Sequence, residues 1–265
     1  MYASDIATID AALKLFADDD KGCYICSALS DFGIEMRVEG KTGAGVVSNI
    51  THDLWNISTL LVRLEWMRGL AVRGQLSTDG WRTFSSLDIE NLFVQVRSSM
   101  DHAAELIQVH LPKGGQLPDS FNKLRSSIDK YRSRLPDELQ QLIESARWFE
   151  QMRGIRDALV HQGGMSLVFG EPAESLHFQV YGKGMNGYAF HPALMFNENV
   201  VHFERYAALL VANLLAFLDR LGGILRSINP ASMKMGPVRS YSPGFSLLRA
   251  WMVQTRQSLT PATSA

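Results

Sequence analysis

The sequence contains few cysteines and has no excess of charge of either sign. Its 265 residues include only two cysteines, Cys23 and Cys26, which are too few and too close together to build a disulfide framework. Twenty-six Lys and Arg residues against 27 Asp and Glu leave a formal net charge of -1. No global positive field therefore draws the chain onto nucleic acid or an anionic membrane, and any basic site must be local. We expect a protein of the reducing cytoplasm.

Long hydrophobic runs are also missing. Residues 1–5 carry no positive segment followed by an apolar one, which argues against a signal peptide. The most apolar run, Tyr206 to Leu218, has 13 residues, whereas a membrane span needs about 18. We therefore expect this run to lie in a buried helix of a protein core.

What the sequence does contain is helical periodicity. Apolar residues recur at spacings of three and four along several stretches, and Asp119–Ser120, Pro136 and Gly163–Gly164 supply start and stop signals between them. The predicted helices cover about residues 6–16, 52–72, 87–111, 121–134, 136–161, 198–227 and 245–257.

One segment alternates at period two instead. Residues 166–169 and 176–181, joined by a short polar turn, predict a β-hairpin over 166–181. No linker rich in Pro or Ser divides the chain into halves. The sequence therefore predicts one all-α domain over 1–265: an up-and-down helical bundle with a core at about 50–225, one inserted β-hairpin and a short C-terminal helix.

Three motif matches are incomplete. Gly40-Lys41-Thr42 resembles the end of a P-loop, but Glu35 stands where that loop needs its first glycine. Residues 182–187 have dinucleotide-binding spacing without the helix that must follow. Cys23 and Cys26 have no second Cys pair or His pair, so we interpret them as packing residues of a short apolar helix. We expect no cofactor and no metal.

The most informative segment is 148–164. Its apolar residues form one helix face, and Arg156, Asp157 and His161 lie near the C-terminal end of the same helix. A rotation of about 100° per residue separates Arg156 from His161 by roughly 140° around the axis and about 7.5 Å along it. The two side chains converge only if Arg156 extends toward the helix end, or if a second copy of the helix brings its own pair to the same cleft.

Arg156, four intervening residues and His161, with Asp157 directly after the arginine, resemble the Arg-x4-6-His motif of the HEPN superfamily. The resemblance covers about residues 50–225, and its specific element is this short motif. It implies a homodimeric helical bundle that acts as a metal-independent endoribonuclease in a toxin–antitoxin or antiviral defence system. RNA and an antitoxin or other partner protein are the partners that it implies.

The resemblance also implies roles for three residues. His161 would be the general base or acid at the ribose 2′-hydroxyl or the leaving oxygen, Arg156 would hold the scissile phosphate, and Asp157 would orient either of them. Imidazole titrates near pH 6.5 and guanidinium binds phosphate in a bidentate manner, so both types suit this chemistry. RNA carries its own nucleophile, so the reaction requires no metal.

A structural interpretation fits the same residues. Basic side chains in the last turn of a helix interact favourably with its dipole, and Gly163–Gly164 is an ordinary helix stop. The alternative function is a non-catalytic helical scaffold for dimerisation or for binding a partner protein.

Two groups of basic residues could line a track of phosphates, or could form ordinary solvated surfaces. Three aromatic residues near the motif could stack on bases, or could belong to the core. The basic groups are Lys123, Arg125, Lys130, Arg132 and Arg134, and Arg226, Lys234, Arg239, Arg249 and Arg256; the aromatic residues are Trp148, Phe149 and Phe169.

Overall fold

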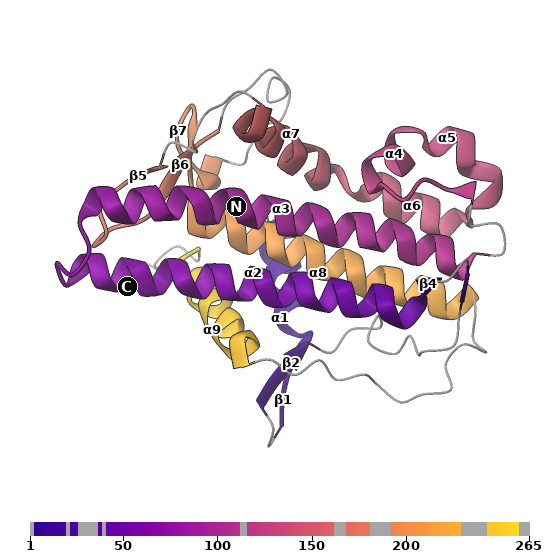
Figure 1. Ribbon diagram of the computed structural model, residues 1–265, viewed down its shortest axis with the longest axis horizontal. Helices are drawn as coiled ribbons and strands as arrows, with labels where there is room; N and C mark the ends of the chain where they lie inside the picture. The colour runs from indigo at the N-terminus through magenta and orange to yellow at the C-terminus, as the bar shows by residue number, and fades with distance from the viewer. Residues whose placement is uncertain are drawn as a thin grey trace.

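The computed structural model describes residues 3–19, 22–25, 37–38, 41–111, 116–161, 168–180, 192–228 and 243–259. Over these ranges the chain is mostly helical and carries a small four-stranded antiparallel sheet (Figure 1). The buried apolar side chains form one cluster, which includes Ile9 and Met252 and so extends beyond the predicted core at 50–225.

Two long antiparallel helices form the front of the molecule in Figure 1: α2 (Gly43–Val72) and α3 (Thr78–His110). Asn56 Nδ2 donates to Gln95 Oε1 at 3.1 Å, and Arg63 forms an ion pair with the Asp88 carboxylate across the same seam. Both helices begin earlier than predicted, at Gly43 and Thr78. In α3 the reason is local, because the Ser77 hydroxyl caps the helix by accepting from Gly80 N at 3.1 Å.

Helix α8 (Phe203–Ile228) is the central core helix, with most of its residues buried against α1, α3, α6 and α9. Its length and hydropathy would be sufficient for a membrane span, but its apolar side chains are largely buried inside the protein. The prediction of a buried helix over Tyr206 to Leu218 is thus confirmed. The two terminal helices that contact α8 are α1 (Ala3–Leu13) and α9 (Pro243–Ser258), and they are joined to each other by the Asp10–Arg256 ion pair.

The region after α1 differs from the prediction. β1 (Phe16–Asp19) and β2 (Gly22–Ile25) form an antiparallel hairpin, so Cys23 lies in a strand rather than in a short helix, and Cys26 lies outside the described residues. β3 (Arg37–Val38) and β4 (Lys41–Thr42) form a second small pair. A four-residue strand offers too few positions for period-two alternation to distinguish it from helix.

The helices predicted over 121–134 and 136–161 are each broken. Ser127 leaves helical geometry with φ -117° and ψ 25°, and Ala146 does so with φ -75° and ψ 51°. Ser120 does not cap the first helix with its side chain; instead Asp101 Oδ1 accepts from Phe121 N at 2.8 Å. The resulting elements are α4 (Phe121–Ser126), α5 (Ile128–Tyr131), the 3-10 helix η3 (Arg132–Arg134), α6 (Asp137–Ser145) and α7 (Arg147–His161).

The sheet lies at one end of the α2–α3 hairpin (Figure 1). β5 (Val168–Phe169) pairs with β6 (His177–Gln179), which confirms the predicted hairpin, but β6 also pairs with β8 (Val200–His202), and β8 with β7 (Met195–Asn197). A 3-10 turn, η4 (Pro192–Leu194), precedes β7. The prediction of a single inserted hairpin is therefore incomplete, because residues 200–202, predicted as helix, pair in the sheet.

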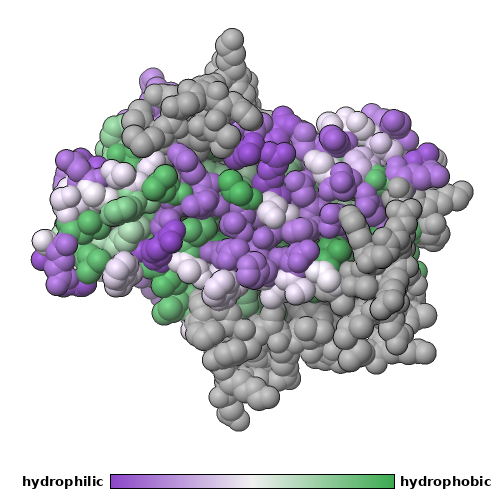
Figure 2. Space-filling view, in the orientation of Figure 1, coloured by the Kyte–Doolittle hydropathy of each residue, from purple (hydrophilic) through white to green (hydrophobic). Residues whose placement is uncertain are grey.

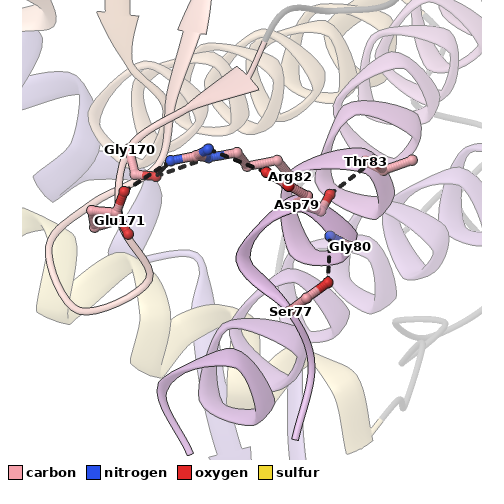
Figure 3. A network of polar contacts seen from close by, with 7 residues as sticks. All are labelled: Ser77, Asp79, Gly80, Arg82, Thr83, Gly170 and Glu171. Carbon is pink, nitrogen blue, oxygen red and sulfur yellow. Dashed lines mark hydrogen bonds and ion pairs between the residues drawn. The ribbon is translucent and has the colours of Figure 1, made fainter. Parts of the chain in front are cut away.

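Two arginines of the α2–α3 hairpin hold the turn between β5 and β6. Arg82 Nη2 donates to Gly170 O and to Glu171 Oε1, each at 2.9 Å (Figure 3). Arg68 Nε donates to Pro172 O and Arg68 Nη2 to Glu174 O, each at 2.8 Å. We call these contacts the arginine clamp. It fixes the sheet to the tip of the two long helices by satisfying the carbonyls of an irregular turn.

Gly170 allows the clamped turn to form. Its φ is 106°, in the left-handed region, and a Cβ atom placed there would lie 2.1 Å from Ser175 O. We predict that Gly170→Ala lowers the free energy of unfolding by about 1 to 3 kcal/mol, because the turn must open and the clamp must shift. Chemical denaturation measures this change.

Gly223→Ala is the matched control. Gly223 lies within α8 and a Cβ there meets nothing within 4 Å, so the same substitution should raise stability by about 0.5 to 1 kcal/mol. A Gly170→Ala protein as stable as the wild type would show that the turn does not need this backbone conformation.

Candidate functional site

The predicted motif helix is present as α7, which ends at His161. Phe149, Met152 and Ile155 are buried and attach one face of the helix to the core. Arg156 and Asp157 lie on a partly exposed side of the same helix. The side chain of His161 lies outside the described residues, so the structure gives no distance from it to Arg156.

Arg156 and Asp157 are brought together. Arg156 Nη1 donates to Asp157 Oδ1 at 2.9 Å, while the side chain of Arg156 stays 19% exposed. Its Nε is buried and has no hydrogen-bond partner among the described residues. The guanidinium is therefore held at one nitrogen, and the partly exposed end of the side chain, rather than the buried Nε, can donate to an added anion.

The neighbouring arginines are already engaged. Arg153 donates to the side-chain oxygen of Asn122, and Arg125 forms an ion pair with Glu150. Both contacts join α7 to α4, so these side chains secure the motif helix to the bundle. Asp157 Oδ2 also lies 3.9 Å from Arg153 Nε, which places Asp157 between two guanidinium groups.

The two predicted basic groups are partly neutralised. Arg132 pairs with Asp129 at 2.7 Å and with Glu144 at 2.6 Å, and Arg256 pairs with Asp10 at 2.7 Å. Lys234 and Arg239 lie outside the described residues. These ion pairs weaken the local positive field that a phosphate track needs.

The three aromatic residues have different environments. Phe149 is 1% exposed and packs edge-on against Phe121 with ring centroids 5.0 Å apart, so it is a core residue and not a base-stacking one. Trp148 is partly buried against the same core. Phe169 is 43% exposed on β5 and remains available for stacking.

A second polar site, absent from the sequence prediction, lies beside the arginine clamp. It is a cavity of about 380 Å³ between α2, the β5–β6 turn, the start of α8 and α9. Carboxylates and guanidiniums both line it. The lining residues are Glu65, Arg68, Glu174, Ser175, His202, Glu204, Arg205, Trp251, Gln254, Thr255 and Ser258.

Two histidines are in contact here, His177 and His202, and His202 lines the cavity. His177 Nε2 lies 2.8 Å from Ser175 Oγ and 3.0 Å from His202 Nδ1, and the His177 ring stacks on Phe196 with centroids 4.2 Å apart. Burial, Arg205 and His177 lower the pKa of His202 to about 4, and burial also lowers the pKa of His177. Both rings are therefore neutral at pH 7. Their 25-residue separation in sequence gave no signal that they would meet.

Comparisons of the chain with models of known protein families, with curated proteins and with solved structures found no match. Within the described ranges, no three His, Cys, Asp or Glu side chains are grouped so that they could hold a metal ion. The assignment of function therefore depends on the geometry of the chain itself.

The histidine pair predicts a pH dependence of stability. His202 has a lower pKa in the folded state than its ordinary 6.5, so between pH 6.5 and about 4 the unfolded state binds a proton that the folded state does not. Stability should be full above this window and should fall as the pH falls through it. Thermal unfolding should show a smaller decrease between pH 7 and pH 5 for His202→Gln than for the wild type.

His52→Gln is the control, because His52 is exposed on α2. It should keep the pH dependence of the wild type. If the melting temperature of His202→Gln fell as much as that of the wild type between pH 7 and pH 5, the buried pair would not be the source of the pH dependence.

Proposed function

We propose that the chain is a metal-independent endoribonuclease of the HEPN type, in which Arg156 and His161 from two copies of α7 act in one composite cleft. The observation that carries the proposal is the state of Arg156. It is anchored to Asp157 at one nitrogen, and its side chain stays partly exposed on the motif helix.

The position of α7 supports this proposal. The helix is held by its buried face and by two ion or hydrogen-bond contacts to α4, so the backbone that carries Arg156 is fixed before any ligand binds. A fixed guanidinium loses less conformational freedom when it binds a phosphate than a mobile one does. The mostly helical fold is the class that the HEPN resemblance implies.

The proposed reaction uses the nucleophile of the RNA. His161 removes the proton of a ribose 2′-hydroxyl, whose oxygen attacks the adjacent phosphorus and expels the 5′-oxygen of the next nucleotide. The products are a 2′,3′-cyclic phosphate and a 5′-hydroxyl. The leaving oxygen receives its proton from the protonated imidazole of the second copy, so one imidazole ends protonated and the other neutral. Arg156 stabilises the charge that develops on the non-bridging oxygens.

Asp157 acts as a positioning residue in this scheme. Its carboxylate accepts from Arg156 Nη1 and lies between the guanidiniums of Arg156 and Arg153. It therefore orients the guanidinium while occupying one of its donor nitrogens, Nη1. The cytoplasmic location and the antitoxin partner stay predictions.

The proposal predicts RNA cleavage by the purified protein in excess chelator. Arg156→Ala and His161→Ala should each reduce the cleavage rate by about a hundredfold or more, since each removes one electrostatic or acid–base contribution. Asp157→Asn should retain more activity than either, because an amide oxygen can still accept from Arg156. Product ends are identified by their sensitivity to phosphatase and kinase.

The control is Arg73→Ala, which removes an exposed arginine at the end of α2 whose Nε donates to Gln75. It should cleave RNA at the wild-type rate. Folded Arg156→Ala and His161→Ala proteins with unchanged cleavage would remove the assignment.

A second candidate function, a dimeric scaffold without catalysis, is favoured by a separate observation. Large apolar side chains are exposed on α2 and α3, and hydrophobic residues gather over the end of this hairpin in Figure 2. Helical spacing places the α3 residues in one stripe and the two tryptophans, three turns apart, in another. The stripes contain Phe84, Leu87 and Val94 on α3, and Trp55 and Trp66 on α2.

These exposed side chains predict self-association. Trp66 is 61% exposed and Leu87 50% exposed, so a charge at either should disrupt an interface without affecting the core. We expect Trp66→Glu and Leu87→Glu to convert a dimer to a monomer in light scattering after gel filtration. A dimer that forms but cleaves no RNA would favour the scaffold, and a wild-type monomer would contradict both candidates.

A further inference from the structure

The cavity beside the arginine clamp is independent of α7 and of the proposed nuclease. Four parts of the chain far apart in sequence form its walls, and the clamp contacts of Arg68 fix the turn that closes one side. Its volume of about 380 Å³ lies within the range of small-molecule sites, roughly 300 to 1,000 Å³.

Two carboxylates of the cavity wall lie beside one guanidinium. Arg68 Nη1 lies 3.6 Å from Glu65 Oε1 and 3.8 Å from Glu204 Oε1, while its other nitrogens donate to backbone carbonyls of the turn. A single guanidinium thus faces two carboxylates. Burial raises the pKa of Glu204, whereas the hydrogen bond from Leu176 N at 3.1 Å and the charge of Arg68 favour its ionised form. An added cation would favour that form further.

A second guanidinium, that of Arg205, lines the same cavity. Arg205 donates through Nη1 to Ala193 O at 2.8 Å, and its charge lies near enough to His202 and His177 to lower the pKa of both. The exposed Glu174 also lines the cavity, and its charge raises the pKa of His177, against the effects of burial and of Arg205. A carboxylate bound beside Arg205 would pair with its guanidinium.

The remaining walls are an indole and neutral polar groups. Trp251 is 8% exposed and lines both the cavity and an inner recess of about 10 Å³, which has room for a single water-sized atom. Trp81 lines the same recess, and its Nε1 is buried without a hydrogen-bond partner among the described residues. An unsatisfied buried donor beside a cavity indicates a position for a polar ligand atom or a bound water.

We propose that this cavity binds a small zwitterion of the α-amino acid class. The ammonium group lies beside the Glu65 and Glu204 carboxylates, the carboxylate lies beside the Arg205 guanidinium, and the ligand side chain packs against Trp251. Glu204 and Arg205 are consecutive in the chain and both line the cavity, which suits the adjacent charges of an α-amino acid. A ligand with only one charge would pair either with the carboxylates or with Arg205 but not with both, so tight binding requires both charges. Ser175, Gln254, Thr255 and Ser258 supply the neutral hydrogen-bonding groups.

The experiment is a thermal-shift screen of the full chain with each common amino acid at millimolar concentration, followed by calorimetry on those that stabilise it. At least one should raise the melting temperature. Its N-acetyl derivative, which lacks the cation, and its amide, which lacks the carboxylate, should each bind at least about tenfold more weakly.

Gln254→Trp and Gln257→Trp are the matched variants. Both glutamines are exposed on α9, but only Gln254 lines the cavity, so a tryptophan there should fill it while one at 257 should not. We expect Gln254→Trp to lose binding by at least about tenfold and Gln257→Trp to bind as the wild type does. Arg156→Ala should also bind normally, which separates this inference from the nuclease proposal.

Three results would overturn the inference. The first is no stabilisation by any amino acid at millimolar concentration. The second is equal binding of the parent, N-acetyl and amide forms, which would show that neither charge of the ligand contributes to binding. The third is unchanged binding in Gln254→Trp, which would place the ligand elsewhere.

Discussion

The arginine clamp is the contact on which most of this structure depends. Arg68 and Arg82 extend from the tip of the α2–α3 hairpin to the carbonyls of the β5–β6 turn, an irregular segment that has no ladder to satisfy them. Charge-assisted bonds to carbonyl oxygens are stronger than neutral ones, and here they connect residues about a hundred positions apart in the chain. β6 begins a few residues after that turn and pairs with β8, and Phe203 N at the start of α8 donates to Leu176 O at 2.9 Å, so the clamped turn is connected directly to both.

The arginines described above have two kinds of environment. Those of the first kind hold the fold together, and the second is that of Arg156, which we propose binds the scissile phosphate. Arg68 and Arg82 use several donors on fixed acceptors, and Arg125 and Arg153 bind α7 to α4. Arg156 has one bond, to the residue beside it, and a buried Nε without a partner among the described residues. Arginines that bond to other elements hold the fold together, whereas Arg156, whose hydrogen bond is to its neighbour in the chain, is suited to bind a phosphate with its exposed donors.

Prediction from sequence succeeded where the pattern was long. Helices α2, α3 and α8 and the buried run Tyr206 to Leu218 follow from apolar periodicity over many turns. It failed at Ser127 and Ala146, where the chain leaves helical geometry although no proline or glycine is present. It failed again at Val200 and Val201, because three strand residues next to a long helix are too few to establish a separate period and their pairing partner lies in β6.

The sequence by itself determined the helical class, the long core helices and the place of Arg156, Asp157 and His161 on one helix, because these depend on residues a few positions apart. Only the tertiary structure decided that β6 and β8 pair, that His177 meets His202 and that Glu204, Arg205 and Trp251 line one cavity. Local periodicity records which face of an element is apolar. It carries no information on which distant polar side chains will share a site, since that depends on how the elements pack.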